Sequence, residues 1–431
     1  MLNLKTVSGA NSVPMRRKIG ISAIIYLVYA AYYISGYSSR MHNYILVALF
    51  GAWLFFAVVE DLPAFNKAIG SRTLAWAFVF LVYYFFTSFL NGDLVNTLEY
   101  VAKYIMFFSC VMQFKYYKIR NNPKELIVIV TGILAAWAFF ALKAILFYIA
   151  VPSAARTLAS DFYAFDSIAI GGGYAIAFGS AILCNYFFER LVNKDIAKKR
   201  AKGLFIAFVA VLFFLLIKTE STLTLIACCI GMVYAVIRKI WRNGGVRNDI
   251  KNLALTIILV LVSLLIMLNI QEIGEWIMSV TENGMDNTIL RRFYRVGQKM
   301  AYSGTGSTYE NYVDDRLGYV KQSWTTFLKN PIAGVGYMSG NIFSRLESNG
   351  VGMHSAICDL LAQHGLLGAI PFIVFFVRAL KKECAVHCNA YILTVIFMVA
   401  FNPFDYFHPY ACMFTLIPMI ELLNDRANKS Q

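Results

Sequence analysis

The sequence has few charged residues. Asp, Glu, Lys and Arg make up 15% of the 431 residues, and 59% are hydrophobic, whereas a soluble domain has about 25% charged residues. The deficit extends along the whole chain, because apolar runs of about 15–25 residues recur from end to end. This composition excludes an ordinary soluble enzyme. It predicts segments that cross a membrane as helices, in which the backbone satisfies its own hydrogen bonds.

Several known patterns are also missing. The alternating segments of about ten residues that form a membrane β-barrel are absent, as are the Walker loop, the GxSxG elbow and the HExxH motif. The first apolar run follows Arg16, Arg17 and Lys18 and has no small-residue cleavage site. We therefore expect it to stay in the protein as the first helix. The eight cysteines lie mostly in apolar runs, which indicates small core residues and not a disulfide framework.

The apolar runs predict an all-α polytopic membrane protein with about twelve transmembrane helices. An even number of crossings places both termini in the cytoplasm if the N-terminus starts there. Most Lys and Arg residues then fall in the inner loops, as the positive-inside rule requires, so the net charge of +15 reflects topology and does not indicate nucleic-acid binding. The predicted spans are residues 20–36, 44–59, 74–90, 97–114, 126–150, 167–187, 204–218, 222–237, 253–270, 366–380, 389–402 and 410–424.

One long stretch has no spanning run. Residues 271–365 lie between predicted helices 9 and 10, on the extracytoplasmic side, and contain many basic residues and a Gly/Pro-punctuated segment. Long loops that are neither linkers nor disordered are usually functional, so we expect a folded cap with short helices. The chain thus divides into helices 1–9 (residues 1–270), this large loop, and helices 10–12 with a cytoplasmic tail (residues 366–431).

Two arginines and one histidine on the predicted outer side are the main candidates for chemistry. Arg316 lies in the segment Tyr312–Trp324, which is expected to be helical. His354 lies in a glycine-punctuated turn that leads into a helix ending at Gly365 and then into a span. Arg156 lies in an outer loop with almost no other basic charge. Taken singly, each is more often a solvated, headgroup-facing or structural residue.

Five further residues are weaker candidates for substrate binding. Arg291 and Arg292 belong to a basic cluster that suits a polyanionic substrate and phospholipid equally well. Lys103 interrupts a predicted span, where a lysine needs a cavity, a partner or a route to the interface. Tyr319 lies in the large loop, and His408 lies in another outer loop.

The motifs of the large loop resemble those of the O-antigen ligase and O-antigen polymerase superfamily of bacterial membranes. The resemblance is specific over about residues 314–368: an Arg before an aromatic-rich helix, then Asn330-Pro-Ile-Ala-Gly-Val-Gly336, then a His before a helix that ends in Gly-Leu-Leu-Gly. It implies an enzyme that joins lipid-linked glycans at the outer leaflet, with an undecaprenyl-pyrophosphate donor and without a metal or other cofactor. It also implies functional roles for Arg156, Arg316 and His354.

The sequence departs from the family pattern at two positions. Ser355 stands where an Asn usually follows the family His. The segment Thr219–Thr222 lacks the second Arg that many members have near the outer start of helix eight. This second departure leaves Lys218 as a weak substitute for that basic residue.

The chemistry of glycosyl transfer fits these residue types. A polyprenyl pyrophosphate is already a good leaving group, so the reaction needs positive charge on the departing oxygens, which arginine supplies through bidentate contacts without a metal. It also needs a base for the acceptor hydroxyl proton, and a histidine with an ordinary pKa near 6.5 suits that task.

The sequence therefore predicts a glycosyltransferase of the cytoplasmic (inner) membrane. We expect it to polymerise undecaprenyl-pyrophosphate-linked repeat units into surface polysaccharide, either O-antigen or capsule. One alternative is an O-antigen ligase that transfers the glycan to lipid A-core. Another is a secondary transporter or flippase of an anionic or lipid-linked substrate, which twelve helices also suit. The expected partners are the lipid-linked donor, a glycan acceptor (a lipid-linked repeat or lipid A-core), the bilayer and a chain-length regulator, and nucleic acid is not among them.

Overall fold

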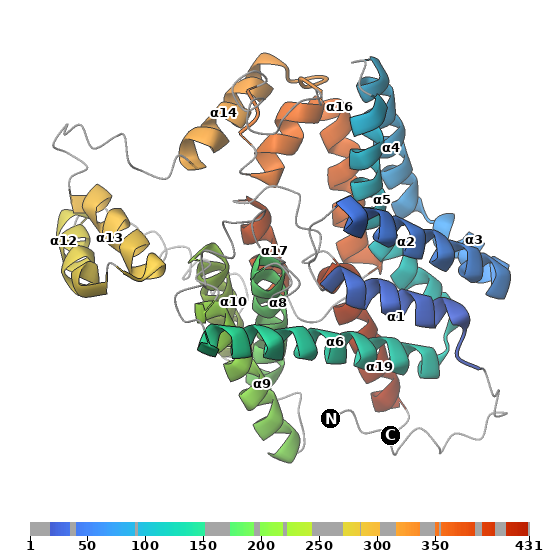
Figure 1. Ribbon diagram of the computed structural model, residues 1–431, viewed down its shortest axis with the longest axis horizontal. Helices are drawn as coiled ribbons and strands as arrows, with labels where there is room; N and C mark the ends of the chain where they lie inside the picture. The colour runs from blue at the N-terminus through green and yellow to red at the C-terminus, as the bar shows by residue number, and fades with distance from the viewer. Residues whose placement is uncertain are drawn as a thin grey trace.

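The computed structural model is all-helical wherever it describes the chain (Figure 1). No β-strand occurs within its described ranges. These ranges are residues 18–34, 40–90, 94–150, 173–193, 199–218, 222–243, 270–284, 286–301, 316–336, 350–352, 355–383, 390–400 and 411–429.

The helices of the N-terminal half follow one another with short connections. They are α1 (Ile21–Ile34), α2 (Arg40–Glu60), α3 (Leu62–Ile69), α4 (Arg72–Leu90), α5 (Leu94–Arg120) and α6 (Pro123–Ala150).

The helices of the C-terminal half are separated by longer connections. They are α8 (Gly173–Val192), α9 (Lys199–Lys218), α10 (Thr222–Asn243), α12 (Ile270–Thr281), the 3₁₀ turn η3 (Glu282–Gly284), α13 (Thr288–Ala301), α14 (Arg316–Lys329), α16 (Ala356–Arg378), α17 (Ala390–Ala400) and α19 (Ile417–Lys429), with π-helical turns at Ala379–Glu383 (η5) and Cys412–Leu416 (η6).

The described part of every predicted span other than 253–270 falls on a helix, whereas residues 253–269 of that span lie outside the described residues. The short helix α3 was not predicted. Its signals are local: the Asp61 carboxylate accepts a hydrogen bond from the Ala64 N–H at 3.0 Å, and Pro63 lies in the first turn. Both features favour a helix start.

Two described helical segments are long and apolar enough to cross a membrane, Pro123–Leu146 and Ala356–Lys381. The segments Leu62–Ile69 and Arg72–Thr87 meet the same test together but are bent by 65° relative to each other. Shorter apolar helices occupy Ile21–Ile34, Tyr44–Glu60, Lys202–Ile217 and Ala390–Ala400. An all-α membrane protein is consistent with these helices, and the number of twelve spans stays a prediction.

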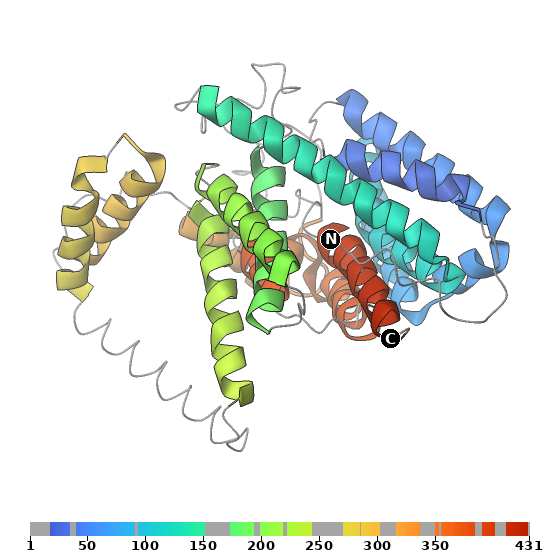
Figure 2. The ribbon, with the colours of Figure 1, turned by 90° about the horizontal axis from the view of Figure 1, so that it is seen from below.

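The helices pack in groups that are visible in two views. In Figure 1, α4, α5 and α16 run up the view, whereas α1, α2 and α6 run across it. Aromatic rings fill the space between α4, α5 and α16: the ring centroids of Phe108 and Phe375 lie 4.6 Å apart, and those of Phe80 and Tyr104 lie 4.8 Å apart. A second group joins α8 with α9, α10 and α17. Figure 2 shows the α12–α13 pair at the edge of the molecule, away from both groups.

Ion pairs join helix ends that are far apart in the sequence. The Arg120 guanidinium at the end of α5 pairs with Glu125 at 2.8 Å and with Glu60 at the end of α2. Glu60 also accepts hydrogen bonds from the backbone N–H and the hydroxyl of Ser22, and Glu125 accepts one from the Gly20 N–H. These contacts link α1, α2, α5 and α6 at one place, and the charges are compensated as buried charges must be.

A similar network joins the second group of helices. Arg190 at the end of α8 pairs with Glu421 of α19 at 2.7 Å. Arg238 of α10 pairs with Glu189 at 2.8 Å, and the other Glu189 oxygen accepts a hydrogen bond from the first backbone N–H of α17, that of Ala390, at 2.7 Å.

Candidate active site

The helices that bear two of the predicted catalytic positions pack against each other. Helix α14 begins at Arg316, and α16 begins two residues after His354. The two helices are in contact along their described parts, and Figure 1 shows α14 lying over the N-terminal half of α16. We refer to residues 316–336, 350–352 and 355–368 as the α14–α16 junction.

Ser323 and Asp359 form a buried polar link across this junction. The Ser323 hydroxyl donates to Asp359 Oδ1 at 2.6 Å and accepts from the Gly352 N–H at 2.8 Å. The second carboxylate oxygen of Asp359 accepts from the Ser355 N–H at 3.0 Å. Ser323 is 0% exposed and Asp359 is 5% exposed. Backbone groups on both sides of residues 353–354 are therefore held by one pair of side chains.

Ser355 also begins helix α16. It adopts an extended conformation, and its hydroxyl accepts from the Cys358 N–H at 3.3 Å, as expected of an N-cap serine. The family residue at this position is usually Asn, which is an equally good N-cap residue. The presence of Ser355 in place of the family Asn therefore has a physical explanation, because the side chain of either Ser or Asn can cap the start of the helix.

Helix α16 breaks at Gly365, and the segment after α14 fills the break. Gly365 has a φ of +56°, and the backbone N–H groups of Leu366 and Leu367 donate to the carbonyls of Pro331 and Ile332 instead of the preceding turn. In return, the N–H groups of residues 335 and 336 donate to the carbonyls of residues 362 and 363 at 2.9 and 2.8 Å. The predicted end of a helix at Gly365 is confirmed by this break, and the apolar segment Ala356–Lys381 extends across it.

Two glycines allow this close approach. A Cβ atom on Gly334 would lie 2.4 Å from the Gln363 carbonyl oxygen, and one on Gly365 would lie 2.4 Å from the Ile332 carbonyl oxygen. Both glycines have positive φ, +71° and +56°. Side chains at these positions would face both a clash and backbone strain. The motif Asn330–Gly336 and the glycine at the end of the helix are therefore two halves of one structural feature.

Two tyrosines tie the junction to α4 and α5. The Tyr83 hydroxyl donates to the carbonyl oxygens of Ala333 and His364 at 2.8 and 2.9 Å. The Tyr104 hydroxyl lies 3.3 Å from Nε2 of His364, a side chain that is 1% exposed. The His364 ring is buried among aromatic rings, as is typical of a structural histidine.

The predicted site residues are only partly within the described structure. His354, Arg156 and His408 lie outside the described residues. The backbone of Arg316 forms the first residue of α14, and that of Tyr319 lies one turn later. Lys103 lies in α5, next to Tyr104.

Arg291 and Arg292 lie elsewhere. They belong to α13, which packs on α12 and lies apart from α14 and α16 in Figure 1. The structure thus packs α14, the helix of Arg316, on α16, and it packs α5, the helix of Lys103, on α16 from His364 onward.

Sequence reasoning missed Ser323, Asp359, Tyr83 and Tyr104. A local signal existed only for Asp359, an acidic residue in the first turn of a helix whose N-cap is Ser355. The other three are recognisable only once the helices are packed, because their partners lie 29 to 281 residues away in sequence.

The described part of the chain contains no group of three or more His, Cys, Asp or Glu side chains that could hold a metal ion.

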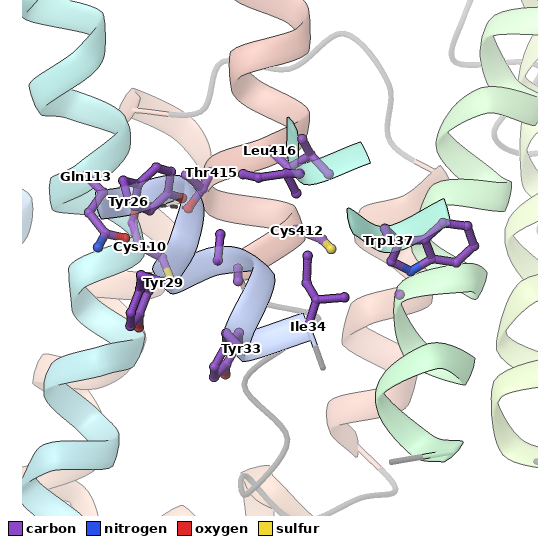
Figure 3. Close-up of a pocket in the computed structure, with 14 residues that line it drawn as sticks. Tyr26, Tyr29, Tyr33, Ile34, Cys110, Gln113, Trp137, Cys412, Thr415 and Leu416 are labelled. Carbon is purple, nitrogen blue, oxygen red and sulfur yellow. Dashed lines mark hydrogen bonds between the residues drawn. The ribbon is translucent and has the colours of Figure 1, made fainter. Parts of the chain in front are cut away.

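A separate pocket lies between α1, α5, α6, α8 and η6 (Figure 3). Its walls are mostly apolar and aromatic, with Tyr26, Tyr29 and Trp137 among them. The amide group of Gln113 lines it, is 1% exposed, and has no hydrogen-bond partner within the described ranges at either its nitrogen or its oxygen. Gln113 follows Tyr104 by nine residues of α5, about 14 Å of helix, so this pocket is distinct from the α14–α16 junction.

The packed helices and their apolar faces define the class first: this is an all-α membrane protein. A family model described as O-antigen ligase matches residues 206–373, which run from α9 into α16 and include the whole junction. This match confirms the resemblance to the O-antigen ligase and polymerase superfamily. The protein is a glycan-processing membrane enzyme of glycosyltransferase-like activity. The chain matches none of the curated proteins with which it was compared.

Proposed function

We propose that this protein polymerises undecaprenyl-pyrophosphate-linked oligosaccharide repeat units into a surface polysaccharide, without a metal, at the outer face of the cytoplasmic membrane. The match to the O-antigen ligase family model supports the reaction class. The α14–α16 junction, which lies inside the matched residues, supports the choice of residues.

The single observation that carries the proposal is that the residues on both sides of His354 are fixed by hydrogen bonds to the Ser323 and Asp359 side chains. Gly352 is bonded to Ser323, and Ser355 is bonded to Asp359. Arg316 precedes Ser323 by seven residues, or two helical turns, so the two positions share the face of α14 that meets α16. Arg316 and His354 are thus expected on the same side of the junction, as a donor-binding group and a base must be.

In the proposed reaction an acceptor sugar hydroxyl attacks the anomeric carbon of the donor glycan. A new glycosidic C–O bond forms, and the bond from the anomeric carbon to the pyrophosphate oxygen breaks. The hydroxyl proton passes to the His354 imidazole, and the polyprenyl pyrophosphate leaves with the electron pair. Arg316 and Arg156 stabilise the negative charge that builds on the leaving oxygens. Ser323 and Asp359 act as positioning residues.

Lys103 and Tyr319 are proposed as further substrate-binding residues. Lys103 is the neighbour of Tyr104, which contacts the first half of α16, so its position in α5 is close to the junction. Tyr319 lies in the first turn of α14, one turn after Arg316. His408 is proposed to line the same cavity from another outer loop.

The proposed topology places both termini in the cytoplasm and residues 271–365 outside it. The ion pairs support this arrangement, because Glu60, Arg120, Glu189 and Glu421 all lie near the ends of predicted spans that the proposed topology assigns to the inner side. The α14–α16 junction falls on the opposite side. Buried ion pairs between ends on different sides would have contradicted the arrangement.

The decisive experiment uses the purified full-length protein, a synthetic undecaprenyl-pyrophosphate oligosaccharide and a gel or mass-spectrometric measurement of product length. The wild type is expected to produce glycans of several repeats on the lipid carrier. His354→Ala and Arg316→Gln are expected to lower the rate about a hundredfold or more. Lys329→Gln, at the exposed far end of α14, is the matched control and should retain the wild-type rate.

The same experiment separates polymerase from ligase. Product that forms only when lipid A-core is supplied would replace the polymerase proposal with a ligase. Wild-type activity in His354→Ala would refute the proposed base. Elongation to a defined length would indicate that a chain-length regulator is unnecessary, whereas uncontrolled lengths fit a requirement for such a partner.

The pocket at Gln113 favours the second candidate, a transporter or flippase. Transporters bind substrates between helices inside the bundle, and this pocket lies there, with an amide on its wall that has no partner among the described residues. Reconstituted protein that moves a labelled lipid-linked oligosaccharide across vesicles, with loss of movement in Gln113→Leu and no product elongation, would favour this candidate.

A further inference from the structure

Helices α12 and α13 form a close antiparallel pair. Gly274 near the start of α12 meets Gly297 near the end of α13: a Cβ atom on Gly297 would lie 2.7 Å from the Gly274 carbonyl oxygen. Gly274, Gly297, Thr281 and Ala301 are buried, so these residues form the contact between the two helices. We call this pair, residues 270–284 and 286–301, the α12–α13 hairpin.

Large apolar side chains remain exposed on this hairpin. Trp276 is 64% exposed and Val280 is 61% exposed on α12. Phe293 is 36% exposed and Val296 is 48% exposed on α13. Each pair is spaced three or four residues apart and so forms a stripe along its helix.

Both stripes lie on the same face of the hairpin. Successive residues of an α-helix are about 100° apart around the helix axis. On each helix, the stripe therefore lies roughly a third of a turn around the axis from the residues that contact the other helix. Both stripes are displaced from the helix–helix contact in the same direction around their own helix. Because the two helices are antiparallel, this displacement puts both stripes on one side of the hairpin. Four large apolar side chains on one exposed face are more than scattered surface hydrophobics.

Basic residues flank this apolar face along α13. Arg292, Arg295 and Lys299 occupy, by helical register, the side of α13 that is turned away from α12, with Arg292 and Lys299 next to the stripe, whereas Arg291 lies opposite the stripe. The acidic residues of α12, Glu272 and Glu275, are exposed on the outer flank of that helix. The face therefore combines apolar side chains, a tryptophan and a one-sided row of basic positions.

We propose that the α12–α13 hairpin is a binding surface for anionic phospholipid and lies in the plane of the bilayer interface. The exposed stripes enter the boundary between headgroups and acyl chains, and the basic row binds headgroup phosphates. An in-plane amphipathic helix has this combination of an apolar face with Trp or Phe and a basic polar face. Trp276 suits the boundary because its ring is apolar and its N–H is polar.

The place of the hairpin in the chain favours a bilayer over a protein partner. The chain leads from the apolar helix α10 into the hairpin and from it, by way of α14, to the apolar helix α16, so the hairpin is tethered next to a membrane whatever else it binds. Charge complementarity selects anionic lipids, because positive residues near such a surface add to binding in proportion to their number. Arg292 then acts on lipid phosphate and not on the donor pyrophosphate.

Hydrogen–deuterium exchange of the full-length protein in nanodiscs tests this proposal without reference to catalysis. Amide exchange in residues 270–301 is expected to be roughly fivefold slower or more in phosphatidylcholine–phosphatidylglycerol discs than in phosphatidylcholine discs. The double variant Arg292→Gln/Arg295→Gln should lose this lipid dependence. Trp276→Ser/Val280→Ser should lose the protection in both lipids, because the apolar contact is removed.

The matched control is Glu272→Gln/Glu275→Gln, which alters the polar flank of α12 and should exchange as the wild type does. Equal exchange in both lipids and in detergent, unchanged by the stripe and arginine variants, would overturn the proposal. Protection that appears only when a polyprenyl pyrophosphate is added to phosphatidylcholine discs would also overturn it, in favour of a donor-binding role for the hairpin. Neither outcome decides whether the enzyme is a polymerase.

Discussion

The ion-pair networks and the α14–α16 junction hold helices together by different means. Around Arg120 and Glu189, side-chain charges meet between helix ends, and removal of one partner leaves the other buried. At the junction, backbone groups of two segments bond to each other, and Gly334 and Gly365 permit the approach. The ion-pair networks can tolerate small movements of the helices, because their charged side chains are long and can adjust. The junction cannot, because its groups are fixed to the backbone, and that rigidity suits a site that must hold a base beside its substrate.

The largest expected effect follows from Gly365→Ala. The new Cβ would lie 2.4 Å from the Ile332 carbonyl oxygen, at a φ of +56°. We expect a loss of unfolding free energy of about 3 kcal/mol or more, because strain and overpacking add. Gly51→Ala is the control: no atom lies within 4 Å of its added Cβ, so it should be neutral or slightly stabilising. Thermal unfolding in detergent measures both. Equal stability of the two variants would contradict the paired-glycine description.

A similar loss of unfolding free energy is expected when Arg120, in the first ion-pair network, is replaced by Ala. This variant leaves Glu60 and Glu125 without their shared cation, and breaking a buried pair on one side costs about 3 kcal/mol. The addition of Glu125→Gln should recover part of the loss, since one uncompensated charge disappears. Activity per folded molecule should stay at the wild-type level, because this network is far from the junction. No recovery in the double variant would mean that Arg120 acts through packing alone.

A smaller effect on stability and a specific effect on activity are expected at Ser323. Ser323→Ala removes the hydroxyl that links Gly352 to Asp359 and should lower the unfolding free energy by about 1–2 kcal/mol. As a positioning residue it should lower kcat more than it raises KM, and Ser323→Thr, which keeps a hydroxyl, should restore most of kcat. An equal fall in kcat for Ser323→Ala and Ser323→Thr would argue for a purely structural role.

A modest effect of the opposite sign, a gain in stability, is expected at the separate pocket. Gln113→Leu replaces an amide that has no partner within the described ranges by an apolar side chain of similar size. An unsatisfied buried polar group costs about 1–3 kcal/mol, so this variant should raise the melting temperature modestly. Glycan polymerisation should not change. Destabilisation, or loss of transport with the reaction intact, would show that the pocket holds a polar ligand.

The sequence predicted much of the local structure. Apolar runs located the helices of the predicted spans outside residues 253–270, and the glycine before Leu366 predicted the break in α16 correctly. The short amphipathic helix α3 was missed, although Asp61 and Pro63 signal it. The functional assignments of Arg156, Arg316 and His354 remain predictions, since two of the three lie outside the described residues and the side chain of the third is not described.

What the sequence by itself determined is what depends on neighbours along the chain: the length of an apolar run, a helix cap, a glycine that ends a helix. The tertiary structure alone decided which groups meet across the chain. Nothing near Ser323 in sequence indicates Asp359, and nothing near Asn330-Pro331 shows that this segment fills the break at Gly365. Such pairs depend on which helix faces pack together, and that choice is made by the summed contacts of many distant residues, so no local pattern contains it.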